Sequence, residues 1–234
     1  MTAFDEHPLR ETLAAEIHAR PHGVIDTPAK ISYLAVVNDE SGAAADHAHL
    51  SELCAAFKVK PPPPESKHFT ESMGRFRLKW ERHTEFTTYT FIREAPFDQP
   101  FKDTVIELVP DDWLANLPGD VLIASHLALE SQDMPERPVP ELVGLFDNNT
   151  VMGGYVADRR AIVWTDFIIH GDRFRRVLIR DLGLNHRSAA RLVQRVLEIE
   201  TYRSLAMLAL PLAREARSRV AKAETEASAI ISRL

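Results

Sequence analysis

Residues 75–93, RFRLKWERHTEFTTYTFIR, form the longest stretch of the chain that is typical of one β-strand. β-Branched and aromatic residues are frequent in it, and alternate positions are expected to face opposite sides of a sheet. Glu81, His83 and Glu85 then share one face, with neighbours about 6–7 Å apart. The stretch therefore predicts a sheet whose central strand carries a row of two carboxylates and an imidazole.

Composition limits the class of protein. Of the 234 residues, 45% are hydrophobic and 26% are charged, which is enough for an ordinary globular core. A net charge of −6 argues against a nucleic-acid partner. The single cysteine, Cys54, excludes an internal disulfide framework and a Cys-rich zinc site, and its apolar helical stripe predicts that it is buried. This cysteine usage is typical of a reducing compartment.

Targeting signals are not evident in the printed residues. The N-terminus has no apolar core of signal-peptide length. The longest apolar stretch, 205–213, is far shorter than the roughly 20 residues that span a bilayer. We therefore expect the chain as printed to be soluble.

Several elements are predicted before the long stretch. Leu9, Leu13 and Ile17 have helical spacing and predict an opening helix over residues 8–20. The remaining elements are a strand over 30–37, a helix over 43–57, a polyproline spacer over 61–64, and a strand over 68–71 that pairs with the long stretch.

The C-terminal part changes from strands to helix. From residue 185 onward the apolar residues keep helical spacing, and Pro211 is expected to kink or interrupt the helix. No capping signal follows Ile231, so we expect the helix to continue in a longer protein. Between the long stretch and this helix, we predict helices over 111–116 and 141–146 and strands over 120–130, 151–156, 161–169 and 174–180.

Together these elements predict the α+β (mixed α/β) class. Residues 1–184 would form a globular head with a largely antiparallel sheet flanked by helices. Residues 185–234 would form a helical stalk or hairpin that mediates oligomerisation. Within the head, Gly153 and Gly154 lie in a strand pattern and predict a bulge or a close backbone approach.

The row of Glu81, His83 and Glu85 is the first candidate site. A histidine with carboxylates can ligate a divalent metal, or a carboxylate can orient the imidazole as a general base. One strand cannot complete such a site, and the opening helix offers Glu16 and His18 as further ligands. The alternative is a structural ladder of cross-strand ion pairs, which is the more common use of such residues.

The opening helix carries the second candidate, Arg10, Glu16, His18 and Arg20. Arginine forks match phosphate and carboxylate groups, so these residues could bind an anion. The favoured interpretation is structural: ion pairs hold this helix on the domain.

A third group lies on the C-terminal helix. Glu198 and Tyr202 are spaced i,i+4, and Glu200 and Arg203 are spaced i,i+3, so each pair can interact along the helix. We interpret Glu198, Tyr202 and Arg203 as a structural hinge between head and stalk.

Other polar residues and motifs give weaker signals. Asp46, His47 and His49 are expected to be solvated at the start of a helix. The sequence has no Walker-type GxxxxGK[ST], GxGxxG, GxSxG or HExxH motif. These absences favour a protein without catalytic activity and without an organic cofactor. A divalent metal bound at Glu81 and His83 is the alternative.

Several motifs in order along the chain resemble the bacterial domain-of-unknown-function family numbered 3422, whose members are membrane-anchored. The resemblance implies a longer protein with a hydrophobic C-terminal membrane segment, and it implies no established activity. The motifs are HPLR at 7–10, EIHARP at 16–21, KWERHTEF at 79–86, WLANLPG at 113–119, TDF at 165–167, and LVQRVLEIETYRSLAMLALPLAR at 192–214.

Three hypotheses about function follow. The leading one is a non-enzymatic scaffold on the cytoplasmic side of the inner membrane, which forms homo-oligomers through its C-terminal helices. The second is a metal- or anion-dependent site, possible only if the opening helix lies against the face that carries His83. The third is a ligand-sensing domain that controls a membrane segment.

Overall fold

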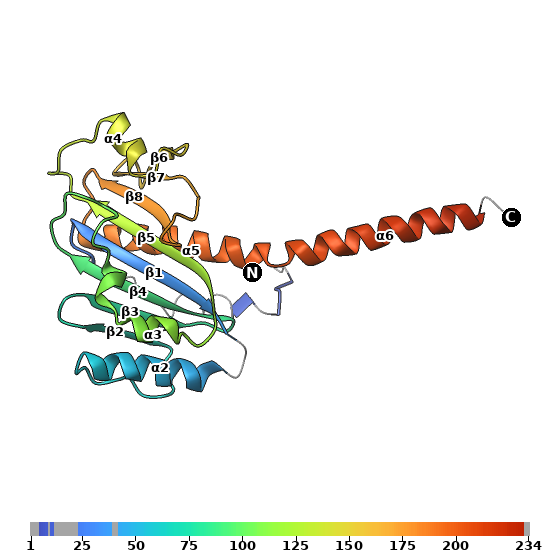
Figure 1. Ribbon diagram of the computed structural model, residues 1–234, viewed down its shortest axis with the longest axis horizontal. Coiled ribbons are helices and arrows are strands. Elements are labelled where there is room, and N and C mark those ends of the chain that lie inside the picture. Colours follow the sequence, from blue (N-terminus) through green and yellow to red (C-terminus); the bar gives the residue numbers. More distant parts are fainter. Residues whose placement is uncertain (1–4, 9, 12–22, 39–41, 232–234) are drawn as a thin grey trace.

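The computed structural model describes residues 5–8, 10–11, 23–38 and 42–231. It contains one eight-stranded sheet with the order β2-β3-β4-β1-β5-β8-β7-β6 (Figure 1). All neighbouring strands are antiparallel except β5 and β8, so the predicted α+β class is confirmed. The strands are β1 (Ala29–Val37), β2 (His68–Ser72), β3 (Arg77–Arg82), β4 (Phe86–Glu94), β5 (Asp120–Glu130), β6 (Met152–Val156), β7 (Ala161–Thr165) and β8 (Arg175–Asp181).

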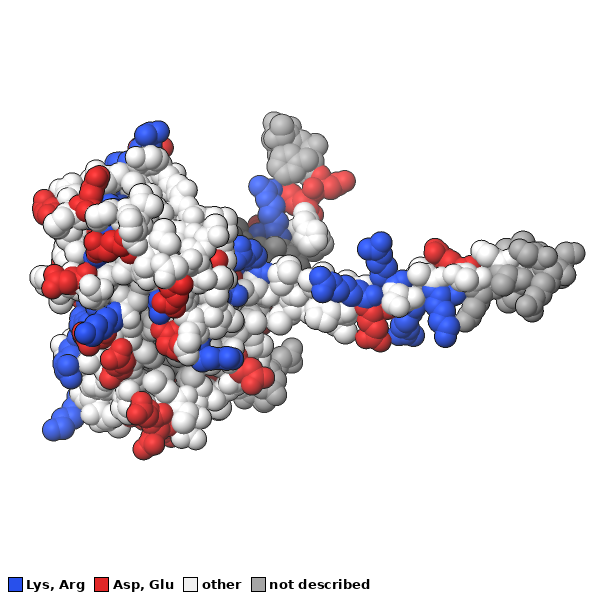
Figure 2. Space-filling view, turned by 45° about the horizontal axis from the view of Figure 1, so that its top comes forward, with Lys and Arg blue, Asp and Glu red and all other residues white. Residues whose placement is uncertain are grey.

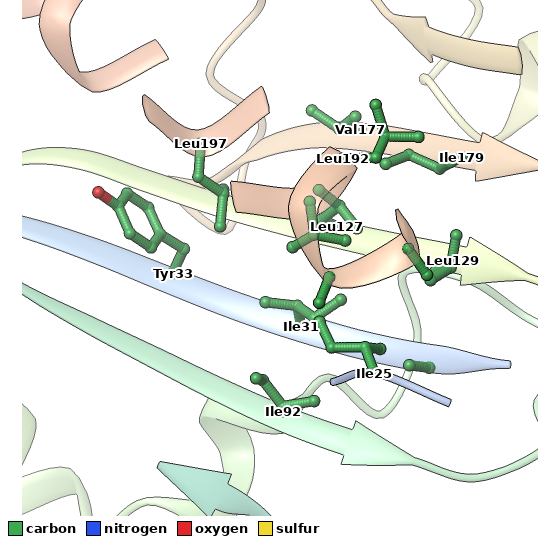
Figure 3. Close-up of a cluster of buried hydrophobic side chains, with 14 of the residues drawn as sticks. Ile25, Ile31, Tyr33, Ile92, Leu127, Leu129, Val177, Ile179, Leu192 and Leu197 are labelled. Atoms are coloured by element: carbon green, nitrogen blue, oxygen red, sulfur yellow. The ribbon is translucent and has the colours of Figure 1, made fainter. Parts of the chain in front are cut away.

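Each face of the sheet packs against its own layer. On one face, α5 (His186–Met207) covers the centre of the sheet, and Leu197 of α5 lies next to Tyr33 of β1 (Figure 3). The other face packs against α2 (Ala43–Ala56), the short 3₁₀ helix η2 (Val105–Leu108) and α3 (Asp111–Ala115). The second layer buries Leu50, Leu53, Trp80, Tyr89, Phe91 and Trp113. Strand alternation divides the apolar residues of β1 between these two cores.

The expectation of one strand over residues 75–93 is wrong. The chain turns at His83, whose backbone N–H donates to the carbonyl of Phe86 at 2.8 Å, and residues 77–94 form a hairpin of β3 and β4. Strands rarely exceed about 10 residues. Folding back lets Trp80 of β3 and Tyr89 of β4 lie opposite each other in one core.

The hairpin also changes the position of this segment in the sheet. Its β3 strand lies next to the edge strand β2, so the prediction that it is the central strand is wrong. The centre consists of β1 and β5, which are buried over most of their length. The prediction for β5 agrees with the structure at both ends, at Asp120 and Glu130.

The C-terminal helices form a long, bent arm. Asn185 caps α5, because its side chain accepts a hydrogen bond from the backbone N–H of Ser188 at 2.8 Å. The helix is interrupted after Met207 and resumes as α6 (Leu210–Ile231), which projects away from the head (Figure 1). The interruption lies just before Pro211, as predicted, because proline has no N–H to continue the helical hydrogen bonds.

Part of this arm belongs to the packing of the head. Ala189, Val193 and Leu197 of α5 are buried against the sheet. The division at residues 184 and 185 stays a prediction, and a shortened chain that keeps this core must end after α5. None of the helices in the described part of the chain has the length and apolar character required to cross a membrane.

Two polar residues expected to be solvated are buried. Asp46 accepts hydrogen bonds from Asn38 Nδ2 at 2.5 Å and from Thr87 Oγ1 at 2.6 Å. His49 stacks on Trp113, with 4.1 Å between ring centroids. The polar first turns of α2 pack against the sheet. The buried face of α2 therefore includes Asp46 and His49 as well as its apolar residues.

Three smaller predictions have clear outcomes. Cys54 is buried, as predicted. Gly153 allows a close approach, because a Cβ there would lie 2.2 Å from Cδ1 of Trp164. The helix predicted over 141–146 begins earlier, as α4 (Val139–Gly144), because Pro138 precedes its first turn.

Candidate functional site

A pocket of about 400 Å³ lies between α5 and the β2–β3–β4 end of the sheet. It brings Glu81 and His83 together with Glu198 and Tyr202, which come from two separate groups of predicted residues. Glu85 is not among the residues that line it; this residue lies exposed in the β3–β4 turn. The site therefore contains Glu81 and His83 of the predicted row, without Glu85. Its other wall is α5, which lies far away in the sequence.

The remaining predicted residues lie elsewhere. Arg203 pairs with Glu200 along α5, with 3.1 Å between the two charged groups, as the spacing predicts. Arg10 forms an exposed ion pair with Glu6 at 2.5 Å. Glu16, His18 and Arg20 lie outside the described residues, so the hypothesis that the opening helix completes the site stays a prediction.

The polar wall of the pocket comes from β3. Because β3 alternates, Arg77, Lys79 and Glu81 all face α5, opposite Ile92, Thr90 and Thr88 of β4. Lys79 Nζ lies 2.9 Å from Glu81 Oε2. The ion pair is thus formed along one strand, rather than across the ladder.

Glu81 has an unsatisfied oxygen in this wall. Its side chain is 10% exposed, and its Oε1 has no hydrogen-bond partner among the described residues. A buried acceptor without a partner costs about 1–3 kcal/mol, and more when it is charged. A ligand that donates a hydrogen bond to this oxygen would remove that cost.

The facing wall comes from α5. Gln194 accepts a hydrogen bond from Lys79 Nζ at 3.4 Å and donates one to Glu198 Oε1 at 2.7 Å. One turn further, Thr201 bonds to the hydroxyl of Tyr33 at 2.8 Å. Residues spaced by three and four lie on one side of a helix, so α5 presents a continuous polar line to the sheet.

Aromatic and aliphatic groups form the rest of the lining. Phe86 stacks with the ring of His83 at 3.9 Å between centroids and meets Tyr202 edge-on at 5.9 Å. Burial raises the pKa of Tyr33, so its hydroxyl stays protonated at neutral pH. The pocket is therefore apolar towards the centre of the sheet and polar towards β3.

Arg77 fixes one end of the pocket. Its Nη2 donates to the carbonyl of Val24 at 2.7 Å and lies 3.1 Å from Glu94 Oε1. These bonds hold the chain segment that enters β1 against β3 and β4. Gly23, Val24 and Ile25 consequently line the pocket.

The lining of the pocket combines polar and apolar groups. No group of three or more His, Cys, Asp or Glu side chains in residues 5–8, 10–11, 23–38 and 42–231 is arranged to hold a metal ion. The pocket does combine an unsatisfied carboxylate oxygen, a nearby ammonium group and a large apolar surface. Such a lining is typical of small-molecule sites.

Sequence analysis missed two buried histidine networks. His170 Nδ1 bonds to Asp147 at 2.8 Å, and its Nε2 lies 3.0 Å from Asp166 Oδ2 without hydrogen-bond geometry. The hydrogen bond from His170 lowers the pKa of Asp147. This network holds the loop between β7 and β8. Its residues are too far apart in the sequence for their spacing to predict the network.

The second network links Ser32, His126 and Asp172. His126 Nδ1 lies 3.0 Å from Ser32 Oγ, and its Nε2 lies 3.9 Å from Asp172. Despite the residue types, this is not a nucleophile site: Ser32 is fully buried, and its Oγ accepts the backbone N–H of Ile106 at 3.1 Å. Only the pairing of β1 with β5 places Ser32 opposite His126.

The family model described as "Protein of unknown function (DUF3422)" matches residues 5–234. The chain belongs to this family. The match confirms the resemblance seen in its motifs. No curated protein and no solved structure matches this DUF3422 chain significantly. Its function must therefore be argued from the geometry of its own residues.

Proposed function

We propose that this DUF3422 chain is the non-enzymatic, ligand-sensing head of a membrane-anchored bacterial protein. The observation that carries the proposal is the pocket between the sheet and α5. One wall of this pocket is a fixed sheet, and the other is the helix that leads into the projecting arm. A molecule bound there contacts the head and the beginning of the arm at the same time.

The ligand class follows from the lining. Glu81 offers an unsatisfied carboxylate oxygen, and Glu198 lies on the opposite wall. Phe86, Ile92 and Leu197 provide apolar surface. These features favour a small amphipathic molecule whose polar end donates hydrogen bonds, such as a primary amine.

Binding would be coupled to the arm through α5. The helix is held over the pocket by the hydrogen bonds of Gln194 and Thr201 and by the packing of Leu197. A ligand that binds better to one placement of α5 shifts the population towards that placement. The direction of α6 would change with it, because α6 follows α5 after a short interruption.

The arm itself supports self-association. Leu212 and Val220 of α6 are 70% and 56% exposed, and α6 projects beyond the head. Most of the stability of a helix in a protein comes from packing of its apolar face, so a packed partner for α6 is expected. We propose that α6 pairs with α6 of a second copy, forming a homo-oligomer.

Charge on the arm fits a position near the cytoplasmic face of the inner membrane. Figure 2 shows basic and acidic side chains along the projecting arm. The sequence of α6 has Arg214, Arg217, Arg219 and Lys222 beside the acidic Glu215 and Glu224. Basic segments are attracted to anionic lipid headgroups by about 1 kcal/mol per cation near the surface. A membrane segment after residue 234 would place the arm there.

A thermal-shift experiment tests the ligand proposal. Hexylamine is the probe, hexanol and hexanoate are the comparison probes, and Glu81→Gln is compared with the exposed control Glu65→Gln. We expect hexylamine to raise the melting temperature of the wild type and of Glu65→Gln, with little effect on Glu81→Gln. An equal shift in all three proteins, or a stronger shift with hexanoate, would contradict the assignment.

The metal- or anion-dependent site remains a second candidate, since Glu81 and His83 line the same pocket. It would use Glu16, His18 or Arg20 from the opening helix. Metal analysis of protein purified without a His tag tests it. A stoichiometric divalent ion that is lost in both Glu81→Gln and His83→Asn would favour this candidate over the sensing head.

A further inference from the structure

A second hollow, of about 520 Å³, lies on the sheet face opposite the α5 pocket. It forms where β4 ends and the loop over residues 95–103 crosses the sheet. Its lining includes Lys30 of β1, Arg93 of β4 and Lys102 of the loop, and also the acidic residues Asp98 and Asp103. Lys30 alternates with Ala29 and Ile31, which pack in the core under α5, so its side chain points to the other face.

Two of these cations oppose each other directly. Lys30 and Arg93 are register partners in the β1–β4 ladder. Lys30 is only 5% exposed, although lysine is almost never buried without a partner. Like charges directly opposite in a sheet are destabilising, so the arrangement calls for a compensating group.

No carboxylate within the described part of the chain provides that compensation at ion-pair distance. Lys30 Nζ instead donates to the carbonyl of Lys102, and Arg93 Nη2 donates to the carbonyl of Asp103 at 2.5 Å. Asp103 has a φ of 48°, in the left-handed region that non-glycine residues rarely adopt. The loop is thus held in an uncommon conformation that supplies two carbonyls to two cations.

Donor capacity remains after these bonds. An ammonium has three N–H donors and a guanidinium has five, and one bond from each is accounted for. Lys30 also lies 5.2 Å from the ring centroid of Phe97, which shields it from water on one side. Burial, followed by the nearby Arg93, lowers the pKa of Lys30, and the carboxylates of Asp103 and Glu107 oppose this decrease. A bound anion would also oppose the effect of Arg93.

We propose that this second hollow is a binding site for a phosphate-type oxyanion, held by Lys30 and Arg93. An arginine fork beside a lysine point charge is a common arrangement for phosphate recognition. The hollow has room for more than one phosphate group, so the anion can be free phosphate or the phosphate of a larger molecule. The site is separate from the α5 pocket and does not depend on the sensing proposal.

Calorimetric titration of the full chain at low ionic strength tests the site, with inorganic phosphate in one arm and glycerol 3-phosphate in the other. Lys30→Met and Arg93→Gln each remove one charge of the site. Lys60→Met removes a charge from an exposed lysine outside it and serves as the matched control. Circular dichroism melts establish that each variant is folded, and Arg93, which is only half-buried, provides the variant least disruptive to packing.

We expect at least one of the two probes to bind the wild type and Lys60→Met with a Kd of about 1 mM or lower. Lys30→Met and Arg93→Gln should each weaken binding about tenfold or more, the effect of losing one charge-assisted contact. If only glycerol 3-phosphate binds, the site is supported, and its ligand is a phosphate group that belongs to a larger molecule. Lack of binding by both probes, or an unchanged Kd in a folded Arg93→Gln variant, would overturn it.

Discussion

Glu81 of β3 lies directly opposite Thr88 of β4 in the hairpin register. Side-chain alternation along a single uninterrupted strand would have placed the two on opposite faces. Because the chain turns at residues 83–85, both instead face α5 and line the same pocket. One turn thus converts a predicted row of charged side chains into one wall of a cavity.

The ion pair of Lys79 and Glu81 should make a modest contribution to stability. The two groups are 17% and 10% exposed, with 2.9 Å between charged atoms. In a double-mutant cycle of Lys79→Met and Glu81→Gln, we expect a coupling free energy of about 1 kcal/mol. Urea unfolding of the four proteins measures it. Zero coupling would show that Lys79 interacts mainly with Gln194 of α5.

Tyr33→Phe should loosen α5 from the sheet. The substitution removes the 2.8 Å bond to Thr201, whose hydroxyl keeps its bond to the carbonyl of Leu197 at 2.9 Å. We therefore expect a loss of about 1 kcal/mol in the free energy of unfolding. Hydrogen exchange should increase in α5 more than in α2, which packs on the other face; equal changes in both helices would contradict a local role.

His126 should make the stability depend on pH. Burial is the main cause that lowers its pKa from 6.5 to about 4. Between those values the unfolded chain binds the proton and the folded chain does not, so stability is complete above about pH 6.5 and decreases as the pH falls towards 4. The shift corresponds to about 3 kcal/mol.

Urea unfolding at pH 7 and pH 4.5 checks this dependence. His126→Gln should lose less stability between the two pH values than the wild type. His68→Gln, at an exposed position, should keep the wild-type dependence. If His126→Gln kept the full pH dependence of stability, groups other than His126 would be responsible for it.

Gly153→Ala should disturb the β6–β7 edge of the sheet. A Cβ at Gly153 would lie 2.2 Å from Cδ1 of Trp164, whereas a Cβ at Gly154 would meet no atom within 4 Å. We expect Gly153→Ala to destabilise the protein by about 1–3 kcal/mol and to alter the fluorescence of Trp164. Gly154→Ala is the matched control and should have little effect through packing.

Removal of α6 should abolish self-association and leave the head folded. A chain that ends at residue 208 keeps Val193 and Leu197 in the core and loses the exposed Leu212 and Val220. Sedimentation equilibrium should show an oligomer for the full chain and a monomer for the shortened one. Two monomers would contradict association through α6, and two oligomers would assign it to the head.

The sequence by itself determined the kinds of element and the family. Apolar spacing predicted α2 and β5, and Pro211 predicted the interruption between α5 and α6. These features are local: they depend on periodicity, on backbone restriction, and on which residues lie within a few positions of one another. The family motifs are likewise a property of the chain in order.

Only the tertiary structure decided which residues meet. Alternation continues in the same way through residues 75–93, so it could not show that the chain turns at His83. Nor could any spacing show that Glu198 faces Glu81 across a pocket, or that Lys30 lies opposite Arg93. Those contacts join segments far apart in sequence, and they are set by strand register and helix packing, which depend on the burial of the whole core.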